Sequence, residues 1–201
     1  MKTVVVTGFG AFPGARSNPT LALMRRLQRH AGRFARLGWR LETRFLPVVY
    51  AAIGPALATI ERECAPDALL HFGLAARRRA ISVETRAQNR LLPLKVDAAR
   101  RLPPRGLAPG GAEFLPVRLS AARLRAAIAA SGARCGLSRD AGGYVCNQTL
   151  YLSLAHSRAT QVGFVHTPKL SHLPGRLDGL ERAALAALFV LLRGVSHMDS
   201  R

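Results

Sequence analysis

The chain has few acidic residues, very few lysines and no long apolar run. Of its 201 residues only 11 are acidic and 30 are basic, which gives a net charge of +19 at pH 7. Such an excess is typical of proteins that bind nucleic acids or anionic membranes. However, only three of the basic residues are lysines, and the other 27 are arginines spread along the chain. GC-rich coding also produces this usage, so the charge alone leaves both explanations open.

Long hydrophobic segments are absent as well. A membrane span needs ~20 apolar residues, whereas the longest apolar run, residues 183–192, has ten and ends before Arg193. The apolar segment near the start, Val4 to Val6, is too short for a signal peptide and is typical of a buried strand. We therefore expect no membrane association and a cytoplasmic location.

Cysteine and aromatic residues are also scarce. The three cysteines, Cys64, Cys135 and Cys146, are odd in number and form neither a disulfide framework nor a CxxC metal pair. A reducing compartment is the expected setting, and no metal or cofactor is predicted. Aromatic residues make up only 6%, and no RNA- or DNA-binding motif is present, which disfavours nucleic acid as a partner. A reactive thiol then becomes the feature to search for.

The chain alternates short apolar segments with amphipathic ones. Its length suits one domain over residues 1–201 with a sizeable core, since 49% of the residues are hydrophobic. Alternating strands and helices predict an α/β fold with a mostly parallel sheet. The predicted strands are 3–7, 40–48, 68–72, 135–138 and 161–166, with an extended segment at 80–88. The predicted helices are one opening at Asn18-Pro19, then 51–63, 120–131, 146–156 and 179–192, and residues 89–116 form a surface excursion rich in proline and glycine.

Cys146 is the strongest candidate for a reactive thiol. It follows Gly142 and Gly143 at the start of a predicted helix. There, unpaired N–H groups and the helix dipole stabilise a thiolate or the oxyanion of a tetrahedral intermediate. A small buried hydrophobic residue is the competing interpretation. Cys64 and Cys135 lack such a glycine-rich approach and fit that second interpretation.

His166 and Glu84 are candidates for the partners of this thiol. His166 ends an apolar strand, where an imidazole can act as general base. A surface or capping histidine is the alternative. Glu84 lies among apolar residues and could orient the imidazole, or it could be an exposed carboxylate paired with Arg79 or Arg86. His71, inside an apolar strand, is expected to be a core histidine, and His156 and His172 are expected at the surface.

The turn after the first strand, Gly8-Phe9-Gly10, matches neither the GxGxxG nor the GxxxxGK[ST] phosphate-binding pattern. Its neighbours Phe9 and Phe12 are either core residues or the walls of an apolar pocket.

Four sequence blocks, in this order, carry a resemblance to a known family. They are VTGFGAF at 6–12 with Asn18-Pro19; Pro66-Asp67, HFGLA at 71–75, ISVE at 81–84 and Asn89; Ser138, Ala141-Gly142 and YVCN at 144–147; and GFVH at 163–166 with Pro168. Together they resemble the pyroglutamyl peptidase I (pyrrolidone-carboxylate peptidase) family of cysteine peptidases.

The resemblance implies a three-layer α/β/α sandwich with a central twisted, mostly parallel, mixed sheet. It also implies removal of an N-terminal pyroglutamyl residue from peptides through a thioacyl-enzyme. Cys146 would be the nucleophile, His166 the acid/base and Glu84 the orienting carboxylate, with no metal. The residues implied in substrate binding are Phe9 and Phe12 against the ring, Asn18, Leu74, Tyr144 and Val145. Relatives are often oligomeric, which makes a homo-oligomer possible.

Several positions depart from the family's pattern. The usual Ala-Arg-Ile-Pro-Asp-Asn segment has no clean match, so Arg100 is the nearest candidate for its supporting arginine. Glu84 is followed by Thr85 in place of the usual arginine. These departures keep open a relative of the same scaffold that acts on another blocked peptide or amide.

Overall fold

The computed structural model describes residues 1–11 and 18–196. The strands are β1 (Lys2–Phe9), β2 (Trp39–Leu46), β3 (Ala68–Leu74), β4 (Ile81–Glu84), β5 (Arg86–Gln88), β6 (Phe114–Pro116), β7 (Cys135–Ser138) and β8 (Gln161–Thr167). The helices are α1 (Pro19–Gln28), α2 (Ala31–Ala35), α3 (Tyr50–Cys64), α4 (Ala121–Ala130), α5 (Val145–His156) and α6 (Arg176–Ser196), with a 3-10 turn η1 (Leu170–His172).

A six-stranded sheet in the order β2-β1-β3-β8-β4-β7 forms the centre of the molecule. The strands β2, β1, β3 and β8 run parallel to one another. β4 pairs antiparallel with β8, and β7 runs parallel to β4. The predicted mixed, mostly parallel sheet is therefore confirmed. β5 and β6 pair with each other in a separate two-stranded sheet.

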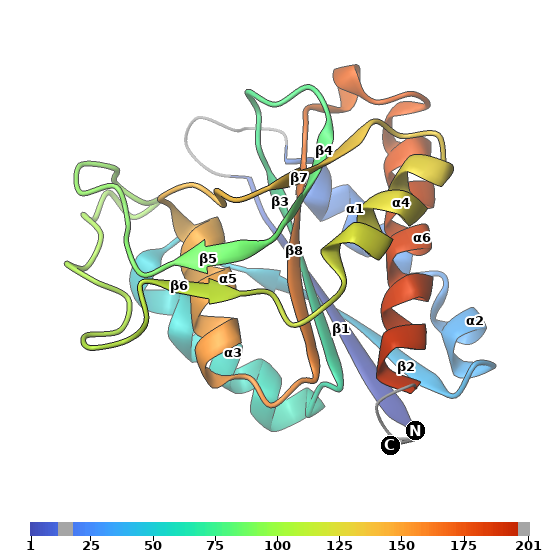
Figure 1. Ribbon diagram of the computed structural model, residues 1–201, viewed down its shortest axis with the longest axis horizontal. Helices are drawn as coiled ribbons and strands as arrows, with labels where there is room; N and C mark the ends of the chain where they lie inside the picture. Colours follow the sequence, from blue (N-terminus) through green and yellow to red (C-terminus); the bar gives the residue numbers. More distant parts are fainter. Residues whose placement is uncertain (12–17, 197–201) are drawn as a thin grey trace.

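Helices cover both faces of the sheet, which gives three layers. Successive strand residues point to opposite faces, so Val4 and Val6 pack in one apolar cluster and Val5 in the other. The first cluster includes residues of α1, α2, α4 and α6, and the second includes residues of α3 and α5. Figure 1 shows these two groups of helices on either side of the sheet. The α/β sandwich implied by the family resemblance is thus the observed architecture.

Local capping explains where two of the helices begin. Asn18 accepts a hydrogen bond from the backbone N–H of Thr20 (3.1 Å), and Pro19 follows at the first helical position of α1, as the sequence predicted. The α3 N-terminus has no side-chain cap from its own N-cap residue, Val49. Its first N–H, that of Tyr50, instead donates to the carboxylate of Asp97 (2.9 Å). The long excursion therefore caps α3 from outside.

The structure differs from the predicted elements in three places. The extended segment 80–88 is divided into β4 and β5, which belong to different sheets. The short helix α2 was not predicted because Phe34 is its only buried residue, so it carries no apolar periodicity. The excursion 89–116 is irregular as predicted, apart from β6. Side-chain bonds from Asn89 to the backbone of Leu107 and Ala108 hold it in shape.

Candidate active site

A pocket of about 640 Å³ lies at the edge of the sheet where β1, β3 and β8 end. Parallel strands place their carboxyl ends at one edge, which is where α/β proteins usually bind ligands. Phe9, Leu74 and His166 come from the ends of these strands, and Tyr144, Val145 and Cys146 come from the start of α5. The pocket therefore brings together segments that lie far apart in the sequence.

Cys146 occupies the first turn of α5, as predicted. Gly142 has a φ of +79°, a conformation that favours glycine, and its N–H donates to Asp140 Oδ1 (2.8 Å). This turn leads into Tyr144, the extended N-cap residue of α5. The next residue but one, Cys146, is half-buried and lines the pocket.

Gly73 of β3 leaves the space that the thiol occupies. A Cβ at Gly73 would lie 2.9 Å from Cys146 Sγ and 2.7 Å from Cζ of Phe164. Real side chains do not approach so closely, so only bare backbone fits between these two groups. The end of β3 and the start of α5 are packed against each other through this contact.

His166 and Glu84 are directly joined. His166 Nδ1 lies 2.8 Å from Glu84 Oε1, and both side chains are buried. The hydrogen bond engages Nδ1 and leaves Nε2 as the nitrogen available to other groups. Glu84 is therefore neither exposed nor paired with Arg79 or Arg86, and His166 is not a surface histidine.

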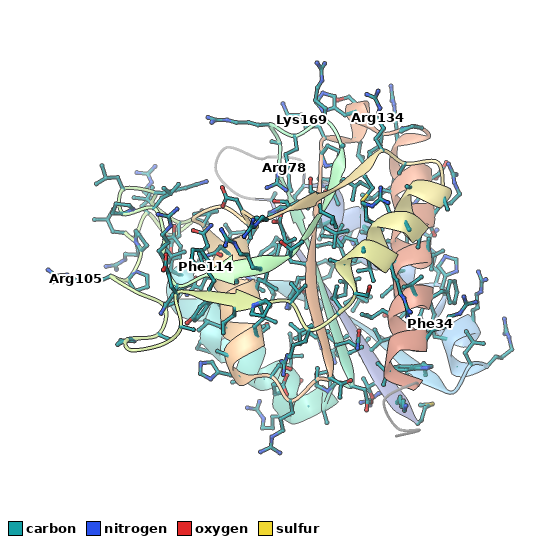
Figure 2. The ribbon with its side chains drawn as sticks, in the orientation of Figure 1. Phe34, Arg78, Arg105, Phe114, Arg134 and Lys169 are labelled. Atoms are coloured by element: carbon teal, nitrogen blue, oxygen red, sulfur yellow. The ribbon has the colours of Figure 1, made fainter. Side chains whose placement is uncertain are left out.

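Arg78 is the arginine that contacts this pair. Its Nη1 donates to Glu84 Oε1 (2.7 Å), and its Nη2 donates to Ser138 Oγ (3.2 Å) and to the backbone oxygen of Asp140 (2.7 Å). Figure 2 shows Arg78 near the β4 end of the sheet. Arg100, the sequence candidate for a supporting arginine, is exposed in the excursion and does not line the pocket. Arg78, in the connection between β3 and β4, is instead the arginine that contacts Glu84.

Burial controls the charge of both reactive groups. It lowers the pKa of His166 below its ordinary value, although Glu84 opposes this shift, and Arg78 adds to it. Burial also raises the pKa of the Cys146 thiol to about 12, against the lowering effects of Lys95 and Arg78. Among these influences on the thiol, burial is the largest. Both shifts favour the uncharged imidazole and the uncharged thiol in the free site.

Lys95, which the sequence did not single out, also lines the pocket. Its Nζ lies 4.2 Å from the centroid of the Tyr144 ring, a cation–π distance. Its backbone oxygen accepts a hydrogen bond from the Tyr50 hydroxyl (2.8 Å). Nothing in the local sequence marks it, because it lies in an irregular segment about 50 residues from the helix that it faces.

The residues implied in substrate binding share this pocket where the structure describes them. Asn18, besides capping α1, donates from Nδ2 to the backbone oxygen of Gly10 (3.1 Å). Phe12 lies outside the described residues. The others that line the pocket are Phe9, Leu74, Tyr144 and Val145.

The remaining histidines and cysteines lie elsewhere. His71 is a core histidine, as predicted: it is buried, with Nδ1 2.7 Å from Thr7 Oγ1 and Nε2 3.0 Å from Ser153 Oγ. His156 is exposed, and His172 is half-buried. Neither Cys64 nor Cys135 lines the pocket.

The described residues were also searched for metal sites, membrane-spanning helices and other pockets. Over residues 1–11 and 18–196, no group of three or more potential metal ligands is found, and no helix is long and apolar enough to cross a membrane. A larger hollow of about 830 Å³ lies between α3 and α5 near the start of β3, and none of the three cysteines lines it. The pocket with Cys146 is therefore the candidate active site.

A mixed α/β sheet with a cysteine and a Glu-bound histidine at one edge is the arrangement of a cysteine-type peptidase. More particularly, a family model described as pyroglutamyl peptidase matches residues 2–176, so the chain belongs to the pyroglutamyl peptidase family. A pyrrolidone-carboxylate peptidase of Gloeobacter violaceus is 35% identical over 96% of this chain and 92% of its own length. That of Pyrococcus furiosus is 31% identical over 82% of this chain and 80% of its own.

Solved structures agree with this family. The crystal structure of pyrrolidone carboxyl peptidase from Thermus thermophilus superimposes with a TM-score of 0.82 at 34% identity, and covers 94% of this chain and 100% of its own. A match to the structures of the Pyrococcus furiosus enzyme and its cysteine-free mutant has a TM-score of 0.86 at 27% identity. It covers 96% of this chain and 99% of the other.

Proposed function

We propose that this protein removes an N-terminal pyroglutamyl residue from peptides, with Cys146 as nucleophile, His166 as acid and base, and Glu84 as the carboxylate that orients the imidazole. The observation that carries the proposal is the 2.8 Å contact between His166 Nδ1 and Glu84 Oε1, beside a pocket lined by His166 and Cys146. A nucleophile, a base and a group that orients the base are the parts that acyl transfer requires.

The pocket suits a pyroglutamyl group. The group is a lactam without charge, so an apolar wall with a few hydrogen-bonding groups is an appropriate receptor. Phe9, Leu74 and Val145 supply apolar surface, and Asn18 supplies an amide. Asp140 is the one carboxylate among the described lining residues, and its Oδ1 already accepts from Gly142. Apart from Asp140, the described lining residues offer no carboxylate that could hold a charged N-terminus.

The first half-reaction forms a thioester. The uncharged His166 accepts the thiol proton of Cys146 at Nε2 as the sulfur attacks the pyroglutamyl carbonyl carbon. The oxyanion receives hydrogen bonds from backbone N–H groups at the start of α5. The carbon–nitrogen bond then breaks, and His166 gives its proton to the leaving amine.

The second half-reaction restores the enzyme. His166 accepts a proton from water as the water oxygen attacks the thioester carbonyl. The carbon–sulfur bond breaks, the sulfur regains its proton from His166, and pyroglutamate leaves. In both halves the transient imidazolium lies against Glu84, which Arg78 holds in place by the bonds described above.

Organisation and location belong to the same proposal. We infer that residues 1–201 act as one catalytic domain in a reducing, cytoplasmic setting, where the thiol stays reduced. A homo-oligomer is proposed as its assembly. With a charge of +19 per subunit, association is expected to strengthen as salt screens the repulsion.

The test is hydrolysis of a fluorogenic pyroglutamyl amide under reducing conditions. The wild-type protein should release the fluorophore, and Cys146→Ala should not. Cys135→Ala is the matched control, since Cys135 is also half-buried but does not line the pocket, and it should retain activity. Cleavage by Cys146→Ala would refute the assignment of the nucleophile. A wild-type protein that cleaves acetyl or formyl amides but no pyroglutamyl amide would favour the alternative of a scaffold relative with another blocked substrate.

A further inference from the structure

The wall of the active-site pocket carries two cationic side chains that the proposed chemistry does not use. These are Lys95 and Arg77, both exposed residues that line the pocket. A third, Arg78, is engaged by Glu84, Ser138 and Asp140. Of these two cations, Lys95 is the one whose position is held by several contacts, given below.

Three contacts hold Lys95 at this wall. The backbone N–H of Lys95 donates to the backbone oxygen of Leu92 (3.1 Å) in a tight turn. The backbone oxygen of Lys95 accepts a hydrogen bond from the Tyr50 hydroxyl (2.8 Å). Its Nζ lies over the ring of Tyr144 at 4.2 Å, and the Tyr144 ring in turn packs edge-on against that of Tyr50, with centroids 5.5 Å apart. The two tyrosines therefore fix both ends of the lysine.

The segment around Lys95 is also tied to the rest of the fold. Asp97, two residues further on, is buried and accepts hydrogen bonds from the N–H groups of Tyr50, Ala99 and Arg101 (each 2.9 Å). Because Tyr50 begins α3, the turn that carries Lys95 is anchored to a helix of the core. The position of the ammonium group is thus built into the fold.

Among residues 1–11 and 18–196, no carboxylate forms an ion pair with this ammonium. The contact of Lys95 Nζ is with the aromatic ring of Tyr144, and the described part of the chain places no acidic group within ion-pair distance of it. Asp140 lines the same pocket, and its Oδ1 accepts a hydrogen bond from the backbone N–H of Gly142. A positive group beside the reacting thiol is therefore left for something outside the chain.

The chemistry of the substrate limits which anion can meet the Lys95 ammonium. The pyroglutamyl ring has no charge, and the bond that breaks is a neutral amide. The nearest anion that a pyroglutamyl peptide can bring lies on the residue after the ring. It is either the acidic side chain of that residue or, in a dipeptide, its terminal carboxylate.

We propose that Lys95 is a specificity-determining residue that recognises a carboxylate on the residue following the pyroglutamyl group. This proposal rests on the proposed function, since it names the class of peptide that the same site prefers. Solvent-exposed ion pairs are weak, and a preference of roughly 2- to 5-fold in kcat/KM is expected at low salt. The preference should fall as ionic strength rises, because the pair is open to screening.

The experiment compares matched substrates that differ only in one carboxylate. Pyroglutamyl-glutamate amide against pyroglutamyl-glutamine amide tests the side chain. Pyroglutamyl-alanine against pyroglutamyl-alanine amide tests the terminal carboxylate. The readout is kcat/KM for the substrate with the carboxylate divided by kcat/KM for its neutral partner. A general effect of a variant on the thiol cancels in this ratio. The pair that shows a ratio above 1 identifies the source of the carboxylate.

The variants are Lys95→Met, which keeps length without charge, Lys95→Arg, which keeps the charge, and Arg105→Met as control. Arg105 belongs to the same excursion but lies at its far tip, away from Arg78 and the sheet (Figure 2). The ratio should fall to about 1 in Lys95→Met and stay at its wild-type value in Lys95→Arg and Arg105→Met. Arg77→Met tests the second cation and should change the ratio less than Lys95→Met.

Two results would overturn the proposal. One is a wild-type ratio of 1 for both substrate pairs, and the other is a ratio that survives in Lys95→Met. Both are distinct from failure of the proposed function, in which the wild-type protein would cleave neither the charged nor the neutral member of either pair.

Discussion

Glu84 and His166 meet because β4 pairs with β8 in a register that places Ser82 opposite His166. Ser82 of β4 lies opposite His166 of β8, and Val83 lies opposite Val165. Glu84, two residues after Ser82, faces the same side of the sheet and lies diagonally from His166. The result is the 2.8 Å contact between Glu84 Oε1 and His166 Nδ1. A shift of this register by one residue would turn Glu84 to the other face of the sheet.

Replacement of Glu84 by glutamine tests this contact. Glu84 raises the pKa of His166, so in Glu84→Gln that pKa should fall further and the acidic limb of kcat/KM should move to lower pH. The imidazolium formed in the reaction also loses its counter-charge, and kcat should drop by about 100-fold or more. The pH–rate profiles of the two proteins measure both effects. An unchanged profile would mean that Glu84 does not act on His166.

Replacement of Arg78 should move the acidic limb of the kcat/KM profile to higher pH, opposite to the effect of Glu84→Gln. Arg78 lowers the pKa of His166, so Arg78→Met should raise that pKa and shift the acidic limb to higher pH. Arg78→Lys should restore part of the wild-type profile, because it keeps the charge but loses the fork of bonds to Glu84, Ser138 and Asp140. The neighbouring Arg79, which is exposed, provides the control Arg79→Met. If both methionine variants gave the same shift, the effect would be one of general charge.

Gly73→Ala should displace the reactive thiol. The added Cβ would lie 2.9 Å from Cys146 Sγ and 2.7 Å from the Phe164 ring, and overpacking of this kind costs about 1–3 kcal/mol. We expect kcat/KM to fall by about 10-fold or more, since small misplacement of a reacting group is costly. Gly136→Ala is the matched control, because a Cβ there meets nothing within 4 Å. Activity assays together with urea unfolding separate misplacement from instability, and a fully active Gly73→Ala protein would contradict the close contact.

His71 should make the fold sensitive to acid. Burial lowers the pKa of His71 to about 3, whereas in the unfolded chain it is near 6.5. Below pH 6.5 the unfolded state therefore binds a proton that the folded state does not. His71 should then reduce the free energy of unfolding by up to about 1.4 kcal/mol for each pH unit down to about pH 3. The neutral imidazole also bonds to Thr7 and Ser153.

Urea unfolding of wild-type protein and His71→Gln between pH 7 and pH 4 measures this contribution. The variant is expected to be less stable at pH 7, because glutamine replaces a well-packed ring, but to have a shallower dependence on pH. Parallel curves for the two proteins would show that His71 does not carry the acid sensitivity.

The sequence by itself determined the order of most of the elements and the local geometry of several site residues. Apolar periodicity marked the strands that become β1, β3 and β8 and most of the helices, since burial on one face is written into residue spacing. Asn18-Pro19 marked a helix start, and the glycines before Cys146 marked the turn that delivers it to a helix N-terminus. These signals are local, because caps and turns depend on residues within one or two helical turns of each other.

Only the tertiary structure decided how these pieces meet. The antiparallel pairing of β4 with β8, the engagement of Arg78 with Glu84, and the place of Lys95 over Tyr144 join residues that the spacing of the sequence does not relate. The pKa values of Cys146 and His166 are also set by burial from several elements at once. Strand direction and the contacts of long polar side chains depend on packing across the whole sheet, and no local pattern records them.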